Sequence, residues 1–317
     1  MKRFNSYMLP VVVVAALTSC NHKDLCFDHT HTQNVKVVFD WRNAPDAAPQ
    51  SMELHLYDAS TNESERFSFS GRDGGPIHIQ GGKYNGLCLN NDNTDWAQFR
   101  NISDIEVFEI YTMDAPTLQA YGLLSRAVPR AEGTENERMA VTPQMVWCDR
   151  QDAIDIPIDA TDKTITLYPE EAVCHYTVDI DSIQNMDYLS GSSLDATLSG
   201  MAEGYLQGRK SATDTKVTMP FELLADSDKG NLHAEFLTFG ESPVTKNPHM
   251  LTVYMILSDG SKWYYTFDVS QQIYNAPDPR HVHIIIHGLK LPKPMSASGG
   301  LKPDVNDWNT DYVDITM

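Results

Sequence analysis

The stretch HMLTVYMILSDGSKWYYTFDVS, residues 249–270, decides the fold class of this 317-residue chain. Two arms rich in β-branched and aromatic residues flank Asp259-Gly260, and a glycine there tolerates the positive φ of a tight hairpin turn. The stretch therefore predicts two antiparallel strands joined at this turn. A short helical turn is expected after them, within 268–279, because Pro277 cannot continue a helix.

The same alternation with a period of two residues recurs along most of the chain, whereas a sustained 3.6-residue apolar repeat is almost absent. In MELHLYD, for example, Met52, Leu54 and Leu56 fall on one face of the expected strand. Strands about a dozen residues apart, with Gly, Asn and Asp between them, are typical of a β-sandwich. Besides the hairpin, the expected strands cover 34–41, 52–58, 65–71, 75–82, 83–92, 103–112, 143–149, 153–159, 163–169, 171–181, 194–208, 215–224, 231–240 and 280–292.

A boundary near 160–170 divides these strands into two all-β units. The charged stretch 123–140, with Pro129 and Gly133, is expected to be a loop, and Pro157 places its strand at a sheet edge or a bulge. The tail 297–317 reads as a Gly-Gly linker followed by a terminal strand that completes a sheet. The predicted domains are a signal peptide (1–19), a lipidated tether (20–34), an N-terminal β-sandwich (35–165) and a C-terminal β-sandwich including the tail strand (166–317).

The first residues predict export and lipidation. Lys2 and Arg3 precede a short apolar run, Val11–Leu17, which is far below the roughly 20 residues that a membrane span needs. Leu17-Thr18-Ser19-Cys20 resembles the lipobox of bacterial lipoproteins, in which the chain is cut before the cysteine and its thiol is acylated. The alternative is an incidental cysteine near an ordinary secretory cleavage site. With Cys20 acylated, the protein would be held at the membrane by its N-terminal lipid.

Charge and cysteine content exclude several classes of function. With 43 Asp and Glu against 24 Lys and Arg, the net charge is −19, which argues against binding to nucleic acid or to anionic lipid head groups. The remaining cysteines allow three disulfide pairings, and buried free thiols are the alternative. No C-x-x-C occurs, so neither a redox motif nor a zinc knuckle is present. These cysteines are Cys26, Cys88, Cys148 and Cys174.

Three histidines of HVHIIIH, His281, His283 and His287, share one face of the expected strand and could ligate zinc. His287 lies about 13 Å from His283 along such a strand, too far for a shared ion, so a polar solvent face is the better interpretation. DSDKGN (226–231) begins like a calcium loop but lacks the glycine and glutamate that the EF-hand pattern requires, so it is read as a hairpin turn.

No other constellation predicts a metal, a cofactor or catalysis. Asp179 and Asp181 share a strand face, but nothing around them would separate their pKa values. Motifs for nucleophilic, nucleotide-dependent or zinc-dependent chemistry are absent from the sequence, so the chain is not expected to be an enzyme. The aromatic residues could form a sugar-binding platform but are more typical of a core. They are Trp41, Trp96, Trp147, Trp263, Trp308, Tyr264 and Tyr265.

The order of segments resembles a known family. The lipobox is followed by DLCFDH and VKVVFDW, then by ITLYPEEAVCHYTVDI, DATLSGMAEGY, LSDGSKWYYTFDVSQQI, VHIIIHGLKLP and the closing PDVNDW and VDITM. This order resembles the fimbrillin-associated anchor and accessory lipoproteins of Bacteroidales-type (type V) fimbriae, over essentially the whole mature chain. The resemblance implies two transthyretin-like, Greek-key β-sandwich domains in tandem, an outer-membrane lipoprotein and no enzyme activity. It also implies partners among fimbrial shaft or accessory subunits.

In related structural fimbrillins, subunits join when a strand of one inserts into a groove of another, which is β-augmentation. No motif marks which sheet edge of this chain would accept such a strand. Structural fimbrillins are also cut after an arginine, but the candidates Arg126 and Arg130 are read as loop residues. An alternative function is a surface glycan-binding lipoprotein of a nutrient-uptake system, using Trp263 or Trp96. The sequence leaves open whether the body faces the periplasm or the outside.

Overall fold

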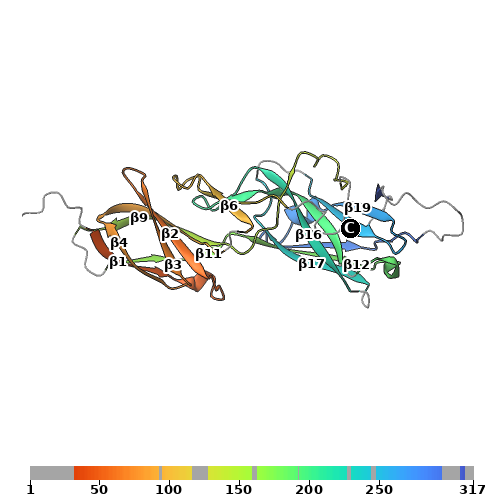
Figure 1. Ribbon diagram of the computed structural model, residues 1–317, viewed down its shortest axis with the longest axis horizontal. Helices are drawn as coiled ribbons and strands as arrows, with labels where there is room; N and C mark the ends of the chain where they lie inside the picture. The colour runs from red at the N-terminus through yellow and green to blue at the C-terminus, as the bar shows by residue number, and fades with distance from the viewer. Residues whose placement is uncertain are drawn as a thin grey trace, which may run out of the picture.

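The computed structural model describes residues 32–92, 95–115, 128–158, 163–191, 193–226, 230–243, 248–294 and 308–310. These residues form an all-β protein with four sheets, which confirms the predicted fold class. Figure 1 shows an elongated molecule with a group of strands toward each end and β6 and β11 between them. No helix among the described residues is long and apolar enough to cross a membrane. Short 3-10 turns lie at Trp41–Asn43 (η1) and Met186–Tyr188 (η3).

The first group is a sandwich of two sheets, with strand orders β10-β1-β4 and β11-β9-β5-β2-β3. The alternating pattern turns Val37 and Ile165 of the smaller sheet toward Met52 and Leu54 of the larger one, and all four are at most 2% exposed. The strands are β1 (Thr32–Phe39), β2 (Ser51–Asp58), β3 (Ser64–Ser70), β4 (Gly74–Gln80), β5 (Gly82–Asn90), β9 (Trp147–Ile156), β10 (Lys163–Leu167) and β11 (Glu170–Glu171).

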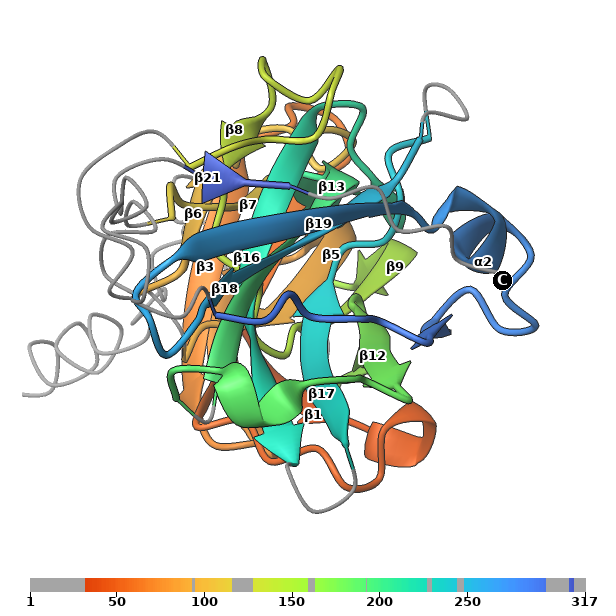
Figure 2. The same ribbon diagram turned by 90° about the vertical axis from the view of Figure 1, so that its right-hand side faces the viewer.

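The second group is one nine-stranded sheet, β20-β12-β17-β16-β13-β18-β19-β21, with β8 pairing β16 beside it. The sheet folds over on itself because β16 pairs with β13 along most of its length but with β17 only at Leu224–Asp226. Val178 and Ile284 of one layer thus share a core with Leu198 and Val253 of the other. Figure 2 shows the two layers end-on, with β12 and β17 below β13 and β19. The strands are β8 (Arg138–Met139), β12 (Cys174–Asp181), β13 (Ser193–Ala202), β16 (Lys216–Asp226), β17 (Asn231–Thr238), β18 (Met250–Ile256), β19 (Lys262–Asp268), β20 (His281–His287) and β21 (Trp308–Asn309).

A small sheet, β15-β14-β7-β6, joins strands from the two halves of the chain. Its residues pack with the outer face of the larger first sheet, so Tyr57 and Leu87 share a third core with Phe108, Tyr205 and Phe239. The boundary expected between 165 and 166 lies inside β10, which pairs with β1. The strands are β6 (Ala97–Arg100), β7 (Glu109–Thr112), β14 (Gly204–Leu206) and β15 (Ser211–Ala212).

The hairpin predicted for 249–270 is confirmed, because β18 and β19 pair along their whole length and Gly260 has a φ of 81°. The helical turn after it is confirmed as α2, Ser270–Tyr274. The strand predicted for 103–112 is wrong over its first half: the amides of Asp104 and Val107 bond to carbonyls three residues earlier, so only Glu109–Thr112 is extended.

Two further predictions are corrected or completed by the pairing of strands. The strands expected at 143–149 and 153–159 are one strand, β9, with an irregularity near Ala153 (φ 56°), and it ends at Ile156, directly before Pro157. In the tail, Trp308–Asn309 pairs parallel with β19. The signal peptide, Cys20, Cys26, Arg126 and the terminal alternation at 312–317 lie outside the described residues.

Candidate functional site

Strand β3 is the outermost strand of the larger first sheet and pairs with β2 on one side only. The amide of Asp58 bonds to the carbonyl of Glu63, and that of Gly71 to the carbonyl of Gln50. In an antiparallel pair, every second residue directs its backbone N–H and C=O groups at the neighbouring strand. These two bonds therefore show that the N–H and C=O groups of Glu65, Phe67 and Phe69 point toward β2. The intervening residues direct their backbone N–H and C=O groups away from the sheet, and none of these groups bonds another described backbone group. They are Ser64, Arg66, Ser68 and Ser70.

Three other edges are partly covered or lack a donor. The side-chain amide of Gln272, from α2, donates to the carbonyl of Ile285 at 2.9 Å and accepts from its amide at 2.7 Å. It thus bonds β20 as a neighbouring strand would. The edge of β19 is paired with β21 at Lys262 and Trp263. Strand β4 includes Pro76, which has no amide hydrogen to donate. Among the described strands, β3 therefore offers the longest edge with a full set of donors.

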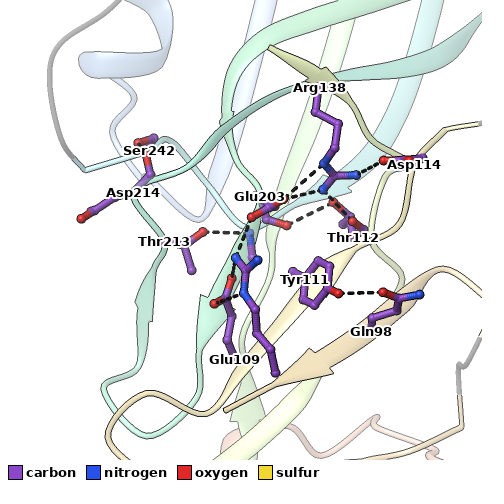
Figure 3. Close-up of polar contacts among 12 residues, drawn as sticks. Gln98, Glu109, Tyr111, Thr112, Asp114, Arg138, Glu203, Thr213, Asp214 and Ser242 are labelled. Atoms are coloured by element: carbon purple, nitrogen blue, oxygen red, sulfur yellow. Dashed lines mark hydrogen bonds and ion pairs between the residues drawn. The ribbon is translucent and has the colours of Figure 1, made fainter. Parts of the chain in front are cut away.

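A charge network with buried carboxylates connects β6 and β7 to β8 and to Glu203, which lies between β13 and β14 (Figure 3). Arg100 donates two hydrogen bonds to Glu109, at 2.6 and 2.5 Å, and one to Glu203 at 2.6 Å. Arg138 donates to Glu203 at 2.8 Å and to Asp114 at 2.8 Å. Glu109 and Glu203 are only 5% and 7% exposed. Hydrogen bonding to Glu109 raises the pKa of Arg100 further above its ordinary value, so this guanidinium stays charged.

The network is suited to holding strands together rather than to chemistry, because its guanidinium groups already occupy the buried carboxylates. Arg100 and Glu203 are 103 residues apart in the sequence. A substrate-binding or catalytic site would need a free hydrogen-bond acceptor or donor, whereas Arg100 and Glu203 are bonded to each other. The network could not be predicted from the sequence, because neither the GMAEGY segment nor the AQFR segment carries a recognisable motif for it.

The three histidines of β20 lie on its outer face, as predicted, and each contacts a carboxylate. His283 lies 2.6 Å and His233 2.8 Å from the two oxygens of Asp179, while His287 lies 2.8 Å from Asp181. Hydrogen bonding to Asp179 raises the pKa of His233. No group of three or more metal-ligating side chains occurs within the described ranges.

The cysteines and aromatic residues serve the cores. Cys88, Cys148 and Cys174 are free thiols, and Cys88 and Cys148 belong to different core clusters. Burial raises the pKa of Cys148 to about 12, so this thiol is unreactive at neutral pH. Of the proposed sugar platform, Trp96 is 5% exposed and Trp263 packs against the core of the second group.

The remaining predicted loop features have simple structural roles. DSDKGN joins the end of β16 at Asp226 to the start of β17 at Asn231, as the hairpin interpretation requires. Arg130 donates to the hydroxyl of Thr218 at 3.1 Å, so its side chain is tied to the second sheet.

Comparison with known proteins gives a family. The family model described as "Domain of unknown function (DUF5119)" matches residues 19–222. The chain belongs to the DUF5119 family. Among curated proteins, no sequence matches it.

Several solved structures resemble this DUF5119 protein to different degrees. A "putative adhesin" from Bacteroides ovatus ATCC 8483 is 19% identical, with a TM-score of 0.64, and the match covers 88% of this chain and 99% of that one. The fimbrial anchor protein Mfa2 from Porphyromonas gingivalis is 14% identical (TM-score 0.48), over 81% of this chain and 90% of that one. A protein of Bacteroides thetaiotaomicron VPI-5482 described among "putative polysaccharide binding proteins (DUF1812)" is 10% identical (TM-score 0.47), over 81% and 90%.

Proposed function

We propose that this DUF5119 protein is an anchor or accessory subunit of a fimbrium, held in the outer membrane by a lipid on Cys20, and that it acts by binding rather than by catalysis. Support comes from the ordered segments that resemble fimbrial anchor lipoproteins and from the fold shared with the Bacteroides ovatus protein. The observation that carries the proposal is the free edge of β3. In this proposal the edge accepts a strand from a shaft or accessory subunit.

The physical basis is the pairing capacity of that edge. Four residues of β3 direct donors and acceptors outward, and each backbone hydrogen bond formed with an added strand contributes about 1 kcal/mol net. Ser64, Ser68 and Ser70 have small polar side chains, which keep the edge soluble before assembly.

In this proposal the two halves of the chain lie at different distances from the membrane. The lipidated tether would end where β1 begins, at Thr32. The first sandwich contains β1 to β5 and β9 to β11, and the nine-stranded sheet forms the second unit. β1 begins at Thr32 at the end of the molecule remote from most of the nine-stranded sheet (Figure 1), so the first sandwich would lie nearest the membrane. The buried network of Arg100, Glu109, Arg138 and Glu203 would make the junction stiff enough to transmit the pull of a fimbrium.

The test uses strains that lack the gene and are complemented with the wild-type chain, Ser68→Pro or Ser68→Ala. Proline at Ser68 removes an outward N–H without touching the ladder to β2, whereas alanine keeps that N–H. We expect shaft subunits to co-purify from outer membranes with the wild-type chain and Ser68→Ala, but not with folded Ser68→Pro. Equal recovery of shaft subunits with Ser68→Pro, or unaltered fimbrial retention without the gene, would refute the proposal.

A further inference from the structure

A cavity of about 500 Å³ lies on the outer face of β2 and β3, on the side opposite the first core. The alternation that points Met52 and Leu54 inward turns Glu53 and His55 into this cavity. The segment that follows β6 lies over this face and lines the cavity with Ile102, Ser103 and Phe108. The main lining residues of the cavity are Glu53, His55, Arg66, Asn91, Phe99 and Ile102. The volume is in the range of small-molecule binding sites.

One wall of the cavity is polar and organised around Glu53, which is 7% exposed. The carboxylate accepts a hydrogen bond from the side-chain amide of Asn91 at 2.6 Å and lies 3.8 Å from the guanidinium of Arg66. On its other side it lies 3.4 Å from the Nε2 atom of His55. His55 is fixed in turn by edge-to-face packing on Phe108, with ring centroids 5.1 Å apart. Glu53 and His55 are thus buried and held in place without a ligand, while Arg66 is an exposed donor at the rim of the cavity.

The opposite wall is apolar. Phe99 is half-buried, and its ring packs edge-on against Phe108 at 5.9 Å. Ile102 is 50% exposed at the mouth, although most large apolar side chains of the described chain are buried. Leu89 completes this side. A ligand that fills the cavity would therefore meet carbon atoms on one face and hydrogen-bonding groups on the other.

We propose that this cavity binds a neutral carbohydrate, one or two pyranose rings in size. The apolar wall suits the C–H face of a pyranose, and the hydroxyl groups can donate to Glu53 and accept from Arg66 and Asn91. The charges of Glu53 and Arg66 balance, so an anionic or cationic ligand would leave one of them unpaired. The site is independent of the β3 backbone edge, since it uses side chains on one face of the sheet.

The test is calorimetry and saturation-transfer NMR on the purified mature chain, with glucose, galactose, mannose, N-acetylglucosamine, lactose and maltose as probes. Sialic acid and glucosamine serve as charged counterparts. We expect at least one neutral probe to bind with a Kd at or below about 10 mM. Arg66→Ala should weaken that binding about tenfold, and Ile102→Asp should abolish it.

Glu65→Ala is the matched control, because Glu65 is an exposed neighbour on the same strand whose side chain lies on the other face. It should bind as the wild type does. No binding of any neutral probe at about 10 mM would overturn the proposal. Tighter binding of a charged probe, or equal loss in Glu65→Ala and Arg66→Ala, would overturn it as well. Fimbrial assembly is read separately through Ser68→Pro, so failure of one proposal leaves the other standing.

Discussion

Replacing Glu203 by glutamine tests the interpretation that the buried charge network fastens the junction between the two groups of strands. Glu203 follows β13 directly and receives hydrogen bonds from two arginines that belong to β6 and β8. Glutamine has nearly the same shape but no charge. The guanidinium groups of Arg100 and Arg138 would then face each other with one carboxylate fewer between them.

The expected loss of stability depends on the burial of Glu203 and on the carboxylates that the two arginines keep. Removing one partner of a buried ion pair costs about 3–5 kcal/mol. Arg100 keeps Glu109 and Arg138 keeps Asp114, and the two arginine side chains are 40% and 29% exposed, so part of the loss is recovered by solvent and by these partners. We expect Glu203→Gln to lower the free energy of unfolding by about 2–4 kcal/mol, and the Tm by about 5–15 °C.

The assay is urea unfolding followed by tryptophan fluorescence, together with a thermal scan. Asp114→Asn is the matched control, because Asp114 contacts the same Arg138 at 2.8 Å but is 81% exposed. An exposed pair contributes about 1 kcal/mol or less. A loss under about 1 kcal/mol for Glu203→Gln, or an equal loss for Asp114→Asn, would refute the idea that burial makes this network structurally important.

Three more predictions concern single titrating or modified groups. Burial, with the neighbouring charge of Glu222, raises the pKa of Asp195 from 3.8 to about 7, so its ionisation opposes folding increasingly as pH rises from 3.8 to 7. Asp195→Asn should therefore stabilise the protein by about 1–2 kcal/mol above pH 7 and hardly at all below pH 4; a benefit confined to acid would contradict this. The pKa of His233 is raised, so its pairing with Asp179 stabilises below about pH 6.5 and is lost as pH rises through the folded pKa. His233→Gln should cost less than about 1 kcal/mol at pH 5.5 and nothing at pH 9, as unfolding curves at the two pH values can show. Finally, Cys20→Ser should release the chain from outer membranes, and mass spectrometry of the wild-type N-terminal peptide should find an acylated thiol; an unmodified thiol would contradict lipidation.

The strands could be predicted from the sequence because each carries its own alternating pattern and turn residues. The arms around Asp259-Gly260 and the face shared by Met52, Leu54 and Leu56 are local signals of this kind. The strand predicted over 103–112 failed because apolar residues that alternate in a turn look like a strand, and Asn101 adopts a positive φ that starts a series of turns instead. The alternation of apolar residues along a short segment does not reveal where the backbone reverses.

The functional features depend on contacts across long stretches of sequence and could not be predicted in this way. Glu53 and His55 lie on the strand face opposite Met52 and Leu54, as the alternation requires, but the cavity exists only because 99–108 folds over that face. The same holds for Arg100 and Glu203. The free edge of β3 depends on the order of strands in the sheet, and no sequence motif marks the strand that lies at an edge.

Hydrogen exchange at the edge of β3 tests the central claim most directly. The amides of Arg66 and Ser68 point outward, while those of Phe67 and Phe69 bond to β2 and serve as internal controls. In the free protein, Arg66 and Ser68 should exchange rapidly and the two phenylalanines slowly. In assembled fimbriae, strand addition predicts strong protection of Arg66 and Ser68 with no change at the controls. Exchange at Arg66 and Ser68 that stays as fast in fimbriae as in the free protein would contradict it.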